Sequence, residues 1–191
     1  MRFDRARNAS SGSEHDWGVV AASAGGVEVL RTQLVRPLID RGHTVAVTLT
    51  PTAGEWLRAT GELDKLQDLT GLPARDQPRL PSEPRPHPPI DVFAAAPLSV
   101  NSVAKLALGI ADNQALTMLC ENIAHVPMVV FPRINAAHAR QPAWADHISR
   151  LRSVGVELIY GDAVWPLAEP RAAGPRELPW PTIIDAVLLH C

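Results

Sequence analysis

The sequence has few cysteines, few aromatic residues, no large excess of charge of one sign and no long apolar run. Its two cysteines, Cys120 and Cys191, do not indicate a disulfide framework, so a reducing, cytoplasmic location is expected. The formal net charge of −2 comes without a basic stripe, which disfavours a nucleic-acid partner. No uninterrupted apolar run approaches ~18 residues, so neither a membrane span nor a membrane partner is expected.

The N-terminal segment differs from the rest in composition. Residues 1–16, MRFDRARNASSGSEHD, lack the apolar core of a secretory signal and are expected to form a flexible tail. Residues 17–191 are long enough for a single domain with a full core, and the 46% hydrophobic share of the chain is typical of globular proteins. Many of the 18 prolines fall within 73–89 and 166–181, which therefore mark loops.

Short apolar runs alternate with segments of helical periodicity along this domain. The runs predict buried strands at 17–22, 44–50, 91–96, 126–132 and 156–160. The periodic segments predict helices at 27–42, from 51 onward, at 61–71, within 100–124, and at 142–155 and 181–190. Pro37 is expected to kink or end the first helix, and a break is expected near Gly109. The alternation indicates an α/β fold with a parallel sheet covered on both faces.

Small and polar residues follow each of the first two strands. Ser23, Ala24 and Gly25 form either a tight turn with a serine cap or a phosphate cradle at a helix N-terminus. Thr50 and Thr52 either cap the next helix or form a second wall of the same phosphate site. The segment SAGG at 23–26 matches neither a dinucleotide nor a nucleoside-triphosphate motif.

The third and fourth strands are followed in the same way. Pro97 is expected to turn the chain after the third strand, and Ser99 and Asn101 either cap the following helix or face a ligand. Asn135 and His138 follow the fourth strand. Because ligands of open parallel sheets bind beyond the carboxyl ends of the strands, these residues favour a shared site for a phosphorylated, planar ligand.

Two motifs resemble those of the FMN-dependent cysteine decarboxylases, which include phosphopantothenoylcysteine decarboxylases and the peptidyl-cysteine decarboxylases of lantibiotic and related pathways. The first is APLSVNSVAKLALGIADN at 96–113, with matches at Pro97, Asn101, Lys105, Gly109, Ala111, Asp112 and Asn113. The second is PRINAAHA at 132–139, which keeps Pro132 and Asn135 of the family pattern P-x-M-N-x-x-M-W. His138 and Ala139 stand where the family has Met and Trp.

The resemblance implies a flavodoxin-like (Rossmann-like) three-layer sandwich that binds FMN at subunit contacts of a homotrimer or dodecamer. It implies that the FMN phosphate lies near Ser23, Ala24, Gly25, Thr50 and Thr52. It further implies that the ribityl chain and ring system lie near Pro97, Ser99, Asn101, Ala111 and Asp112.

The resemblance also implies the reaction, an oxidative decarboxylation of a cysteine with a free carboxylate, in a peptide or a small thiol. The oxidised flavin removes a hydride equivalent to give a thioaldehyde, and loss of carbon dioxide leaves an enethiol. Asn135 would hold the substrate carboxylate, and His138 lies in the same substrate motif. His87 is either the acid/base residue or a surface histidine. The alternative is an FMN-binding protein with another redox task or a non-catalytic subunit role; no metal site is indicated.

Overall fold

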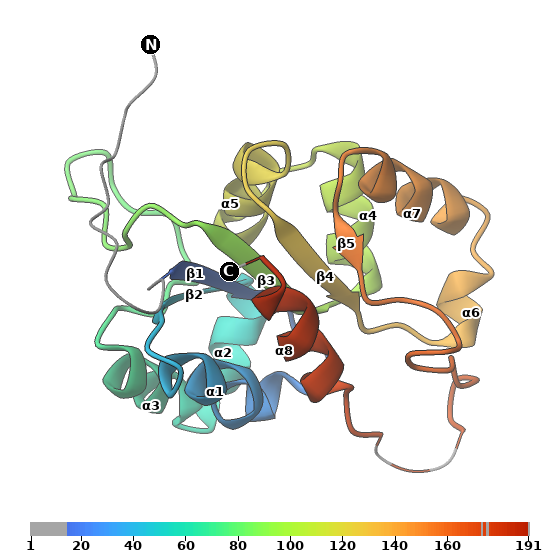
Figure 1. Cartoon of the computed structure of the whole chain (residues 1–191), viewed down its shortest axis with the longest axis horizontal. Helices are drawn as coiled ribbons and strands as arrows, with labels where there is room; N and C mark the ends of the chain where they lie inside the picture. Colours follow the sequence, from blue (N-terminus) through green and yellow to red (C-terminus); the bar gives the residue numbers. More distant parts are fainter. Residues whose placement is uncertain (1–14, 173, 175, 191) are drawn as a thin grey trace.

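The computed structural model describes residues 15–172, 174 and 176–190 of the chain, and its centre is a parallel sheet (Figure 1). The strands are β1 (Asp16–Ala21), β2 (Thr44–Leu49), β3 (Val92–Leu98), β4 (Met128–Pro132) and β5 (Glu157–Leu158). Their order in the sheet is β2-β1-β3-β4-β5, and every pair of neighbours is parallel. The expected parallel α/β sandwich is therefore confirmed, although β5 is shorter than expected.

Helices cover both faces of this sheet, as Figure 1 shows. One layer contains η1 (Val27–Val29), η2 (Arg31–Val35), α1 (Arg36–Ile39), α2 (Pro51–Ala59), α3 (Glu62–Thr70) and α8 (Trp180–Leu188). The other layer contains α4 (Val100–Leu108), α5 (Gln114–Asn122) and α7 (Trp144–Ser153). The short α6 (Ala136–Ala139) follows β4 at the edge of the sheet.

Two apolar cores lie on opposite faces because strand side chains alternate in direction. Val19 of β1 packs into the core that includes Leu34 and Ile183. Its neighbour Val20 packs into the other core, with Phe93 among its members. Both faces of β1 are thus buried, which explains why the central strands are continuous apolar runs and not alternating ones.

The first helical segment is not the continuous helix that its periodicity predicts. It consists of the 3₁₀ turn η1, the π-helical η2 and the four-residue α1. Pro37 lies at the start of α1, and proline has no amide hydrogen and crowds the carbonyl four residues earlier. Wider π-helical hydrogen bonding just before Pro37 accommodates this disturbance.

Pro97 does not turn the chain after β3, contrary to expectation. The strand continues through Pro97 to Leu98, and the Ala96–Pro97 peptide bond is cis. The pairing register between β3 and β4 shifts between Ala95 and Leu98, so an irregularity in the ladder accommodates the proline. The turn begins at Ser99 instead.

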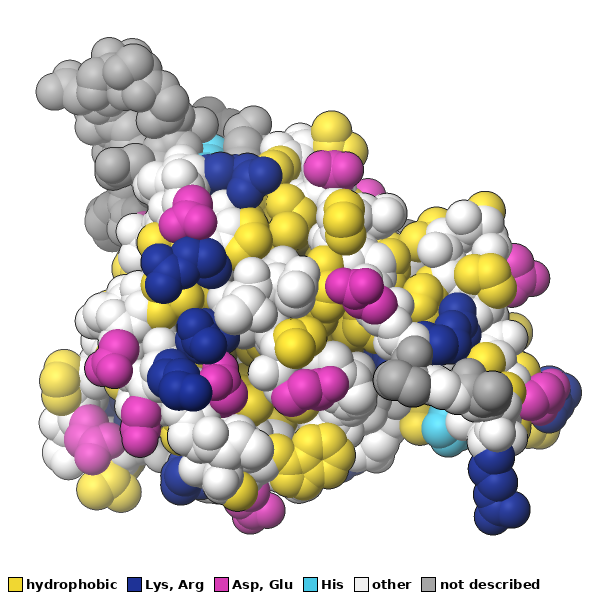
Figure 2. All heavy atoms as spheres, turned by 90° about the horizontal axis from the view of Figure 1, so that it is seen from below, with side chains coloured by type: hydrophobic (Ala, Val, Ile, Leu, Met, Phe, Trp, Pro, Cys, Tyr) yellow, Lys and Arg dark blue, Asp and Glu magenta, His cyan; other side chains and the backbone are white. Residues whose placement is uncertain are grey.

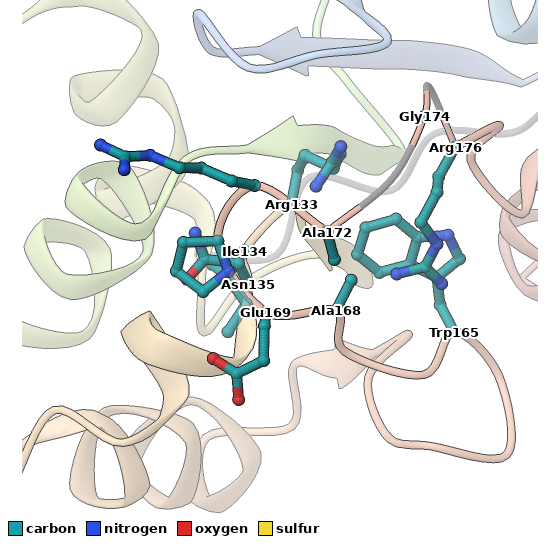
Figure 3. Close-up of a pocket in the computed structure, with 11 residues that line it drawn as sticks. Arg133, Ile134, Asn135, Trp165, Ala168, Glu169, Ala172, Gly174 and Arg176 are labelled. Carbon is teal, nitrogen blue, oxygen red and sulfur yellow. The ribbon is translucent and has the colours of Figure 1, made fainter.

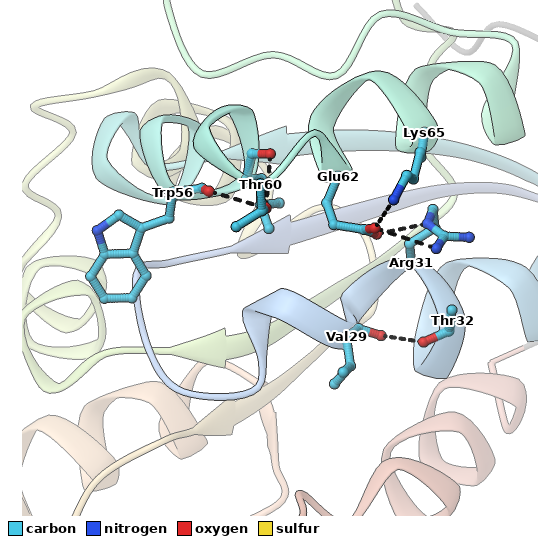
Figure 4. A network of polar contacts seen from close by, with 8 residues as sticks. Val29, Arg31, Thr32, Trp56, Thr60, Glu62 and Lys65 are labelled. Carbon is cyan, nitrogen blue, oxygen red and sulfur yellow. Dashed lines mark hydrogen bonds and ion pairs between the residues drawn. The ribbon is translucent and has the colours of Figure 1, made fainter.

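A polar cluster on the surface joins η2 to α3 (Figure 4). The Glu62 carboxylate accepts hydrogen bonds of 2.8 Å from Arg31 Nε and from Lys65 Nζ. These two cations lower the pKa of Glu62 below its ordinary value. On the face seen in Figure 2, basic and acidic side chains are interspersed among apolar ones.

The structure describes only part of each chain terminus. Residues 1–14 of the expected tail, and Cys191, lie outside them, and β1 begins at Asp16, one residue before the expected domain boundary. Within the described ranges, no helix has the length and apolar character needed to cross a membrane.

Candidate functional site

The carboxyl ends of the four longer strands are joined by backbone hydrogen bonds. Thr50 N donates to Ala21 O at 3.0 Å, and Ala22 N donates to Pro97 O at 2.9 Å. Arg133 N donates to Leu98 O at 2.8 Å. The segments that follow β2, β1, β3 and β4 therefore begin side by side along one edge of the sheet. Since the order of connection reverses between β1 and β3, this edge is the place where open α/β sheets generally bind ligands.

The turn after β1 has a backbone shape that glycine favours. Gly26 has φ of +103°, and a Cβ there would lie 2.3 Å from Leu178 Cδ1, so the turn and Leu178 are in close contact. The Gly26 amide donates a 2.8 Å hydrogen bond to the Glu28 carboxylate. The Glu28 carboxylate thus occupies this amide donor, and a ligand phosphate would have to bind other donors of the turn. Ser23 and Ala24 are partly exposed and Gly25 is exposed beside it.

Thr50 precedes α2 in the N-cap position, but its hydroxyl does not cap the helix. The residue is only 8% exposed, and its Oγ1 has no hydrogen-bond partner among the described residues. Leaving a buried hydroxyl without a partner costs about 1–3 kcal/mol. Thr52, two residues further along the chain, is exposed. An acceptor group at the N-terminus of α2 would satisfy the Thr50 hydroxyl and face the positive end of the helix.

Of the two candidate polar residues after β3, one caps the following helix and the other is exposed. Ser99 caps α4, because its Oγ accepts a 3.3 Å hydrogen bond from Ser102 N. Asn101, in the first turn of the same helix, is exposed. The capping alternative therefore holds for Ser99, while the Asn101 side chain faces solvent at the strand-end edge.

Asn135 caps α6 and keeps its amide donor available. Its Oδ1 accepts a 3.0 Å hydrogen bond from His138 N, which fixes the orientation of the side chain. The Nδ2 group, the donor that a carboxylate needs, makes no hydrogen bond within the described chain. Asn135 lines a cavity of about 180 Å³ between the segment after β4 and the loop that follows β5 (Figure 3). His138 is exposed and does not line this cavity.

The same cavity contains a cationic pair that the sequence did not reveal. Arg133 Cζ lies 4.6 Å from the centre of the Trp165 ring, and Arg176 Cζ lies 4.0 Å from it. Burial, and then the charge of Arg176, lower the pKa of Arg133. In the sequence, Arg133 is marked only by its position as the variable residue of the PRIN motif. Trp165 and Arg176 lie 32 and 43 residues further along, so the motif could not reveal that they lie near Arg133.

His87, Ala111 and Asp112 lie at the opposite edge of the sheet, where the strands have their amino ends. His87 precedes the start of β3, and α4 runs from the strand-end edge back across the sheet before Ala111 and Asp112 follow. A nine-residue helix is about 13 Å long, so these residues do not meet the strand ends within one chain. Asp112 is exposed and paired with Lys105, whose hydrogen bond lowers the pKa of Asp112.

His87 and the segment after Ala111 border one large cavity of about 870 Å³. His87 lines it, as does Thr117, whose hydroxyl donates to Ala111 O at 3.4 Å. His87 Nε2 is 2.7 Å from Pro73 O, and since a carbonyl only accepts, Nε2 carries the hydrogen. Burial lowers the pKa of His87, so the ring is neutral at pH 7 and Nδ1 has a free lone pair.

The described residues contain no group of three or more His, Cys, Asp or Glu side chains arranged for a metal ion. Cys120 is partly buried against the core on the α5 side, and burial raises its pKa. The candidate site therefore consists of small polar, amide and guanidinium groups.

The parallel sheet and its strand order place the protein in the flavodoxin-like class of open α/β folds. The Flavoprotein family model matches residues 7–188, and the chain belongs to this Flavoprotein family. No sequence among the curated proteins matches it significantly.

Solved structures share the fold over nearly the whole chain. An FMN-dependent cysteine decarboxylase, TvaF from thioviridamide biosynthesis, is 19% identical with a TM-score of 0.66, covering 93% of this chain and 98% of that one. A PPC decarboxylase mutant complexed with pantothenoylaminoethenethiol is 19% identical (TM-score 0.63, coverage 93% and 98%). The peptidyl-cysteine decarboxylase EpiD is 15% identical (TM-score 0.62, coverage 92% and 99%). The expected flavodoxin-like fold and resemblance are thus confirmed.

The strand-end residues fit a flavin carrying a phosphate. The Thr50 hydroxyl is buried and unpartnered among the described residues, and it lies at the N-terminus of α2. The Gly26 amide is engaged by Glu28, so a phosphate at the adjoining turn would use the amides of other residues. These observations agree with the flavin cofactor that membership of the family implies.

Proposed function

We propose that the protein is an FMN-dependent enzyme that oxidatively decarboxylates a cysteine bearing a free carboxylate. The observation behind this proposal is that two side chains at the carboxyl ends of the strands each have a hydrogen-bond donor without an acceptor among the described residues. The Thr50 hydroxyl is suited to a phosphate, and the Asn135 amide is suited to a carboxylate. The names of TvaF, EpiD and PPC decarboxylase support the same reaction.

FMN would be held along the strand-end edge. Ser23, Ala24, Gly25, Thr50 and Thr52 would surround its phosphate, since they adjoin the turn after β1 and the N-terminus of α2. Pro97, Ser99 and Asn101 would border the rest of the molecule, because they end β3 and begin α4. When bound, FMN supplies the hydride acceptor that the oxidation requires.

Asn135 would orient the substrate through its carboxylate. Its Nδ2 donates, and the hydrogen bond from His138 N to Oδ1 prevents the side-chain amide from turning over. A neutral amide binds a carboxylate more weakly than a guanidinium does, so it orients the group without strongly stabilising the charge that must be lost. The role of His138 is therefore to position Asn135 through its backbone amide.

We further propose that two copies of the chain complete each site. His87, Ala111 and Asp112, which the family resemblance assigns to the site, lie at the edge opposite Asn135 in one chain. A second copy that places this edge against the first would supply them, as a homotrimer or dodecamer would. Leu108 and Ile110, 50% and 43% exposed, lie beside Ala111 and would be covered in such a contact. In that position the free Nδ1 of His87 would accept or return a proton.

An alternative function is FMN binding with another redox task or a non-catalytic subunit role. One observation favours it: His138 is exposed and Ala139 is small where the family motif has an apolar Met–Trp pair. Another part of the protein would have to supply an apolar wall next to His138 and Ala139. Flavin binding without decarboxylation of any cysteine-terminated peptide would support this alternative.

Two measurements test the proposal. Titration of the purified protein with FMN should give saturable binding and perturbed flavin absorbance bands, whereas a colourless protein that ignores added FMN would contradict it. The second measurement mixes two inactive variants, Asn135→Ala and His87→Ala, after each has been loaded with FMN. Activity should partly return if each site uses two chains, because some mixed contacts combine both intact edges; no recovery would contradict the shared site.

A further inference from the structure

We propose that Arg133 and Arg176, both packed against Trp165, bind an acidic group of the substrate next to the carboxylate held by Asn135. The substrate would then be a cysteine-terminated molecule with a second negative charge, such as a peptide with a nearby Glu or Asp side chain. This inference rests on the proposed function for the identity of the substrate. The anion site itself can be tested without any turnover.

The two guanidinium groups share one aromatic ring. Their central carbons lie 4.6 Å and 4.0 Å from the centre of the Trp165 ring, within the range of a cation–π interaction. The Trp165 indole donates a 3.2 Å hydrogen bond to Glu177 O, which fixes the ring. Two cations gathered on one ring repel each other, and an anion between them would remove this repulsion.

Neither arginine has an anionic partner that would satisfy it. Within the part of the chain that the structure describes, Arg133 and Arg176 form no ion pair, whereas other arginines such as Arg31, Arg58 and Arg140 each pair with a carboxylate. Arg133 Nε is buried and has no hydrogen-bond partner there.

Glu28, which attracts Arg133, and Glu169, which lines the cavity, are both engaged by other groups. Glu28 attracts Arg133 only at longer range, and its Oε2 accepts from the Gly26 amide at 2.8 Å. Glu169 lines the cavity, but both of its oxygens bind the Arg140 guanidinium, at 2.6 Å and 2.9 Å. The cavity therefore keeps an uncompensated positive charge.

The size of the cavity limits the occupant. Its volume of about 180 Å³ lies below the ~300–1,000 Å³ of typical small-molecule sites. A side-chain carboxylate or a phosphate group would fit, and a flavin ring system would not. Guanidinium groups are suited to such oxyanions because they can donate two parallel hydrogen bonds.

The lining of the cavity favours the substrate over the FMN phosphate as the source of the anion. Arg133 is two residues before Asn135, and both line the cavity together with Trp165 and Arg176 (Figure 3). None of the proposed phosphate residues Ser23, Thr50 and Thr52 lines it. Arg133 Nη2 does approach the turn after β1, 3.8 Å from where a Cβ on Gly25 would lie. Binding of the FMN phosphate is therefore the competing outcome that the test must separate.

A first experiment follows the indole N–H signal of Trp165 by nuclear magnetic resonance, assigned with Trp165→Phe. The probes are N-acetyl-glutamate amide, with one negative charge, and its neutral match N-acetyl-glutamine amide, added to FMN-loaded protein. The acidic probe should shift the signal saturably and the neutral probe should not. The shift should be lost in Arg176→Gln and kept in Arg152→Gln, which removes an exposed arginine on α7.

A second experiment measures specificity with alanine-based pentapeptides that end in Cys and have Glu or Gln at one earlier position. Wild-type protein should prefer the best Glu peptide over its Gln match on the order of tenfold in kcat/KM. Arg176→Gln should reduce this ratio to about one, with the larger loss of kcat/KM for the Glu peptide.

Three outcomes would overturn the inference. One is that neither probe shifts the Trp165 signal, or that Arg176→Gln leaves the shift intact. Another is that Arg133→Gln and Arg176→Gln weaken FMN but not riboflavin, which would assign the cationic pair to the cofactor phosphate. The third is equal use of Glu and Gln peptides by wild-type protein. If the probe binds but no peptide is decarboxylated, the proposed function fails and the anion site remains.

Discussion

The Pro97 carbonyl accepts a 2.9 Å hydrogen bond from the Ala22 amide, which ties the end of β3 to the turn after β1. These two strands flank the point where the order of connection in the sheet reverses. The bond therefore fixes the turn after β1, where we propose that the phosphate binds, relative to the start of α4.

Replacing Thr50 with Val should weaken FMN binding without harming the fold. The hydroxyl is buried and unpartnered among the described residues, so its removal should leave the free energy of unfolding unchanged or raise it by up to about 1 kcal/mol. FMN affinity should fall on the order of tenfold, whereas riboflavin affinity should not change. Fluorescence titration of Thr50→Val against Thr50→Ser measures this, and equal loss for both flavins would contradict it.

Replacing Gly26 with Ala should destabilise the protein by about 1–3 kcal/mol. The position has φ of +103°, and the new Cβ would lie 2.3 Å from Leu178 Cδ1. Gly25→Ala is the matched control, because Arg133 Nη2 at 3.8 Å is the nearest atom to a Cβ there. Urea unfolding of both variants checks the prediction. It is wrong if the two substitutions cost the same, and Leu178→Ala should recover the steric part in the Gly26→Ala background.

Glu62→Gln should lower the free energy of unfolding by about 1 kcal/mol at pH 7. Arg31 and Lys65 hold the pKa of Glu62 below its unfolded value, so their stabilisation is complete above the unfolded pKa. It is lost as pH falls through the folded pKa, and the wild-type and variant curves should converge in acid. Denaturant unfolding from pH 7 to pH 3 tests this, with the exposed Asp68→Asn as control. A pH-independent difference would argue against the ion pairs.

His87 should titrate below the ordinary histidine value of 6.5, because burial opposes its charged form. Since the folded pKa lies below the unfolded one, the unfolded chain binds more protons between these values. Stability should therefore fall as pH drops from the unfolded pKa toward the folded one. This fall should be smaller in His87→Gln. Ring-proton resonances of His87 that titrate at or above 6.5 would contradict the prediction.

The regular elements were largely predictable because burial on both faces gives the central strands continuous apolar runs. Gly109, with φ of +70°, also separates α4 from α5 as its sequence position suggested. The backbone around Pro37 and Pro97 was harder to predict, because a local irregularity accommodates each proline. This irregularity is a π-helical segment before Pro37 and a register shift at Pro97. Sequence patterns identify proline but not how the neighbouring chain accommodates it.

Part of the candidate site was also predictable from the sequence, and part was not. The location of Thr50 and Asn135 at one edge was predictable because parallel strands bring the residues that follow them to the same edge. The contacts of Arg133 with Trp165 and Arg176 were not found, because they depend on how the loop after β5 folds back over the sheet. No periodicity or spacing in the chain encodes that path.

The most direct test of the proposed function is mass spectrometry of a peptide that ends in Cys after incubation with FMN-loaded protein. We expect a loss of carbon dioxide and two hydrogens from this peptide, and no change in the same peptide ending in Ser. Asn135→Asp keeps the acceptor for His138 N but removes the Nδ2 donor and adds charge, so turnover should fall by about tenfold or more. An unchanged peptide mass with FMN-loaded wild-type protein, or equal turnover by Asn135→Asp, would contradict the account.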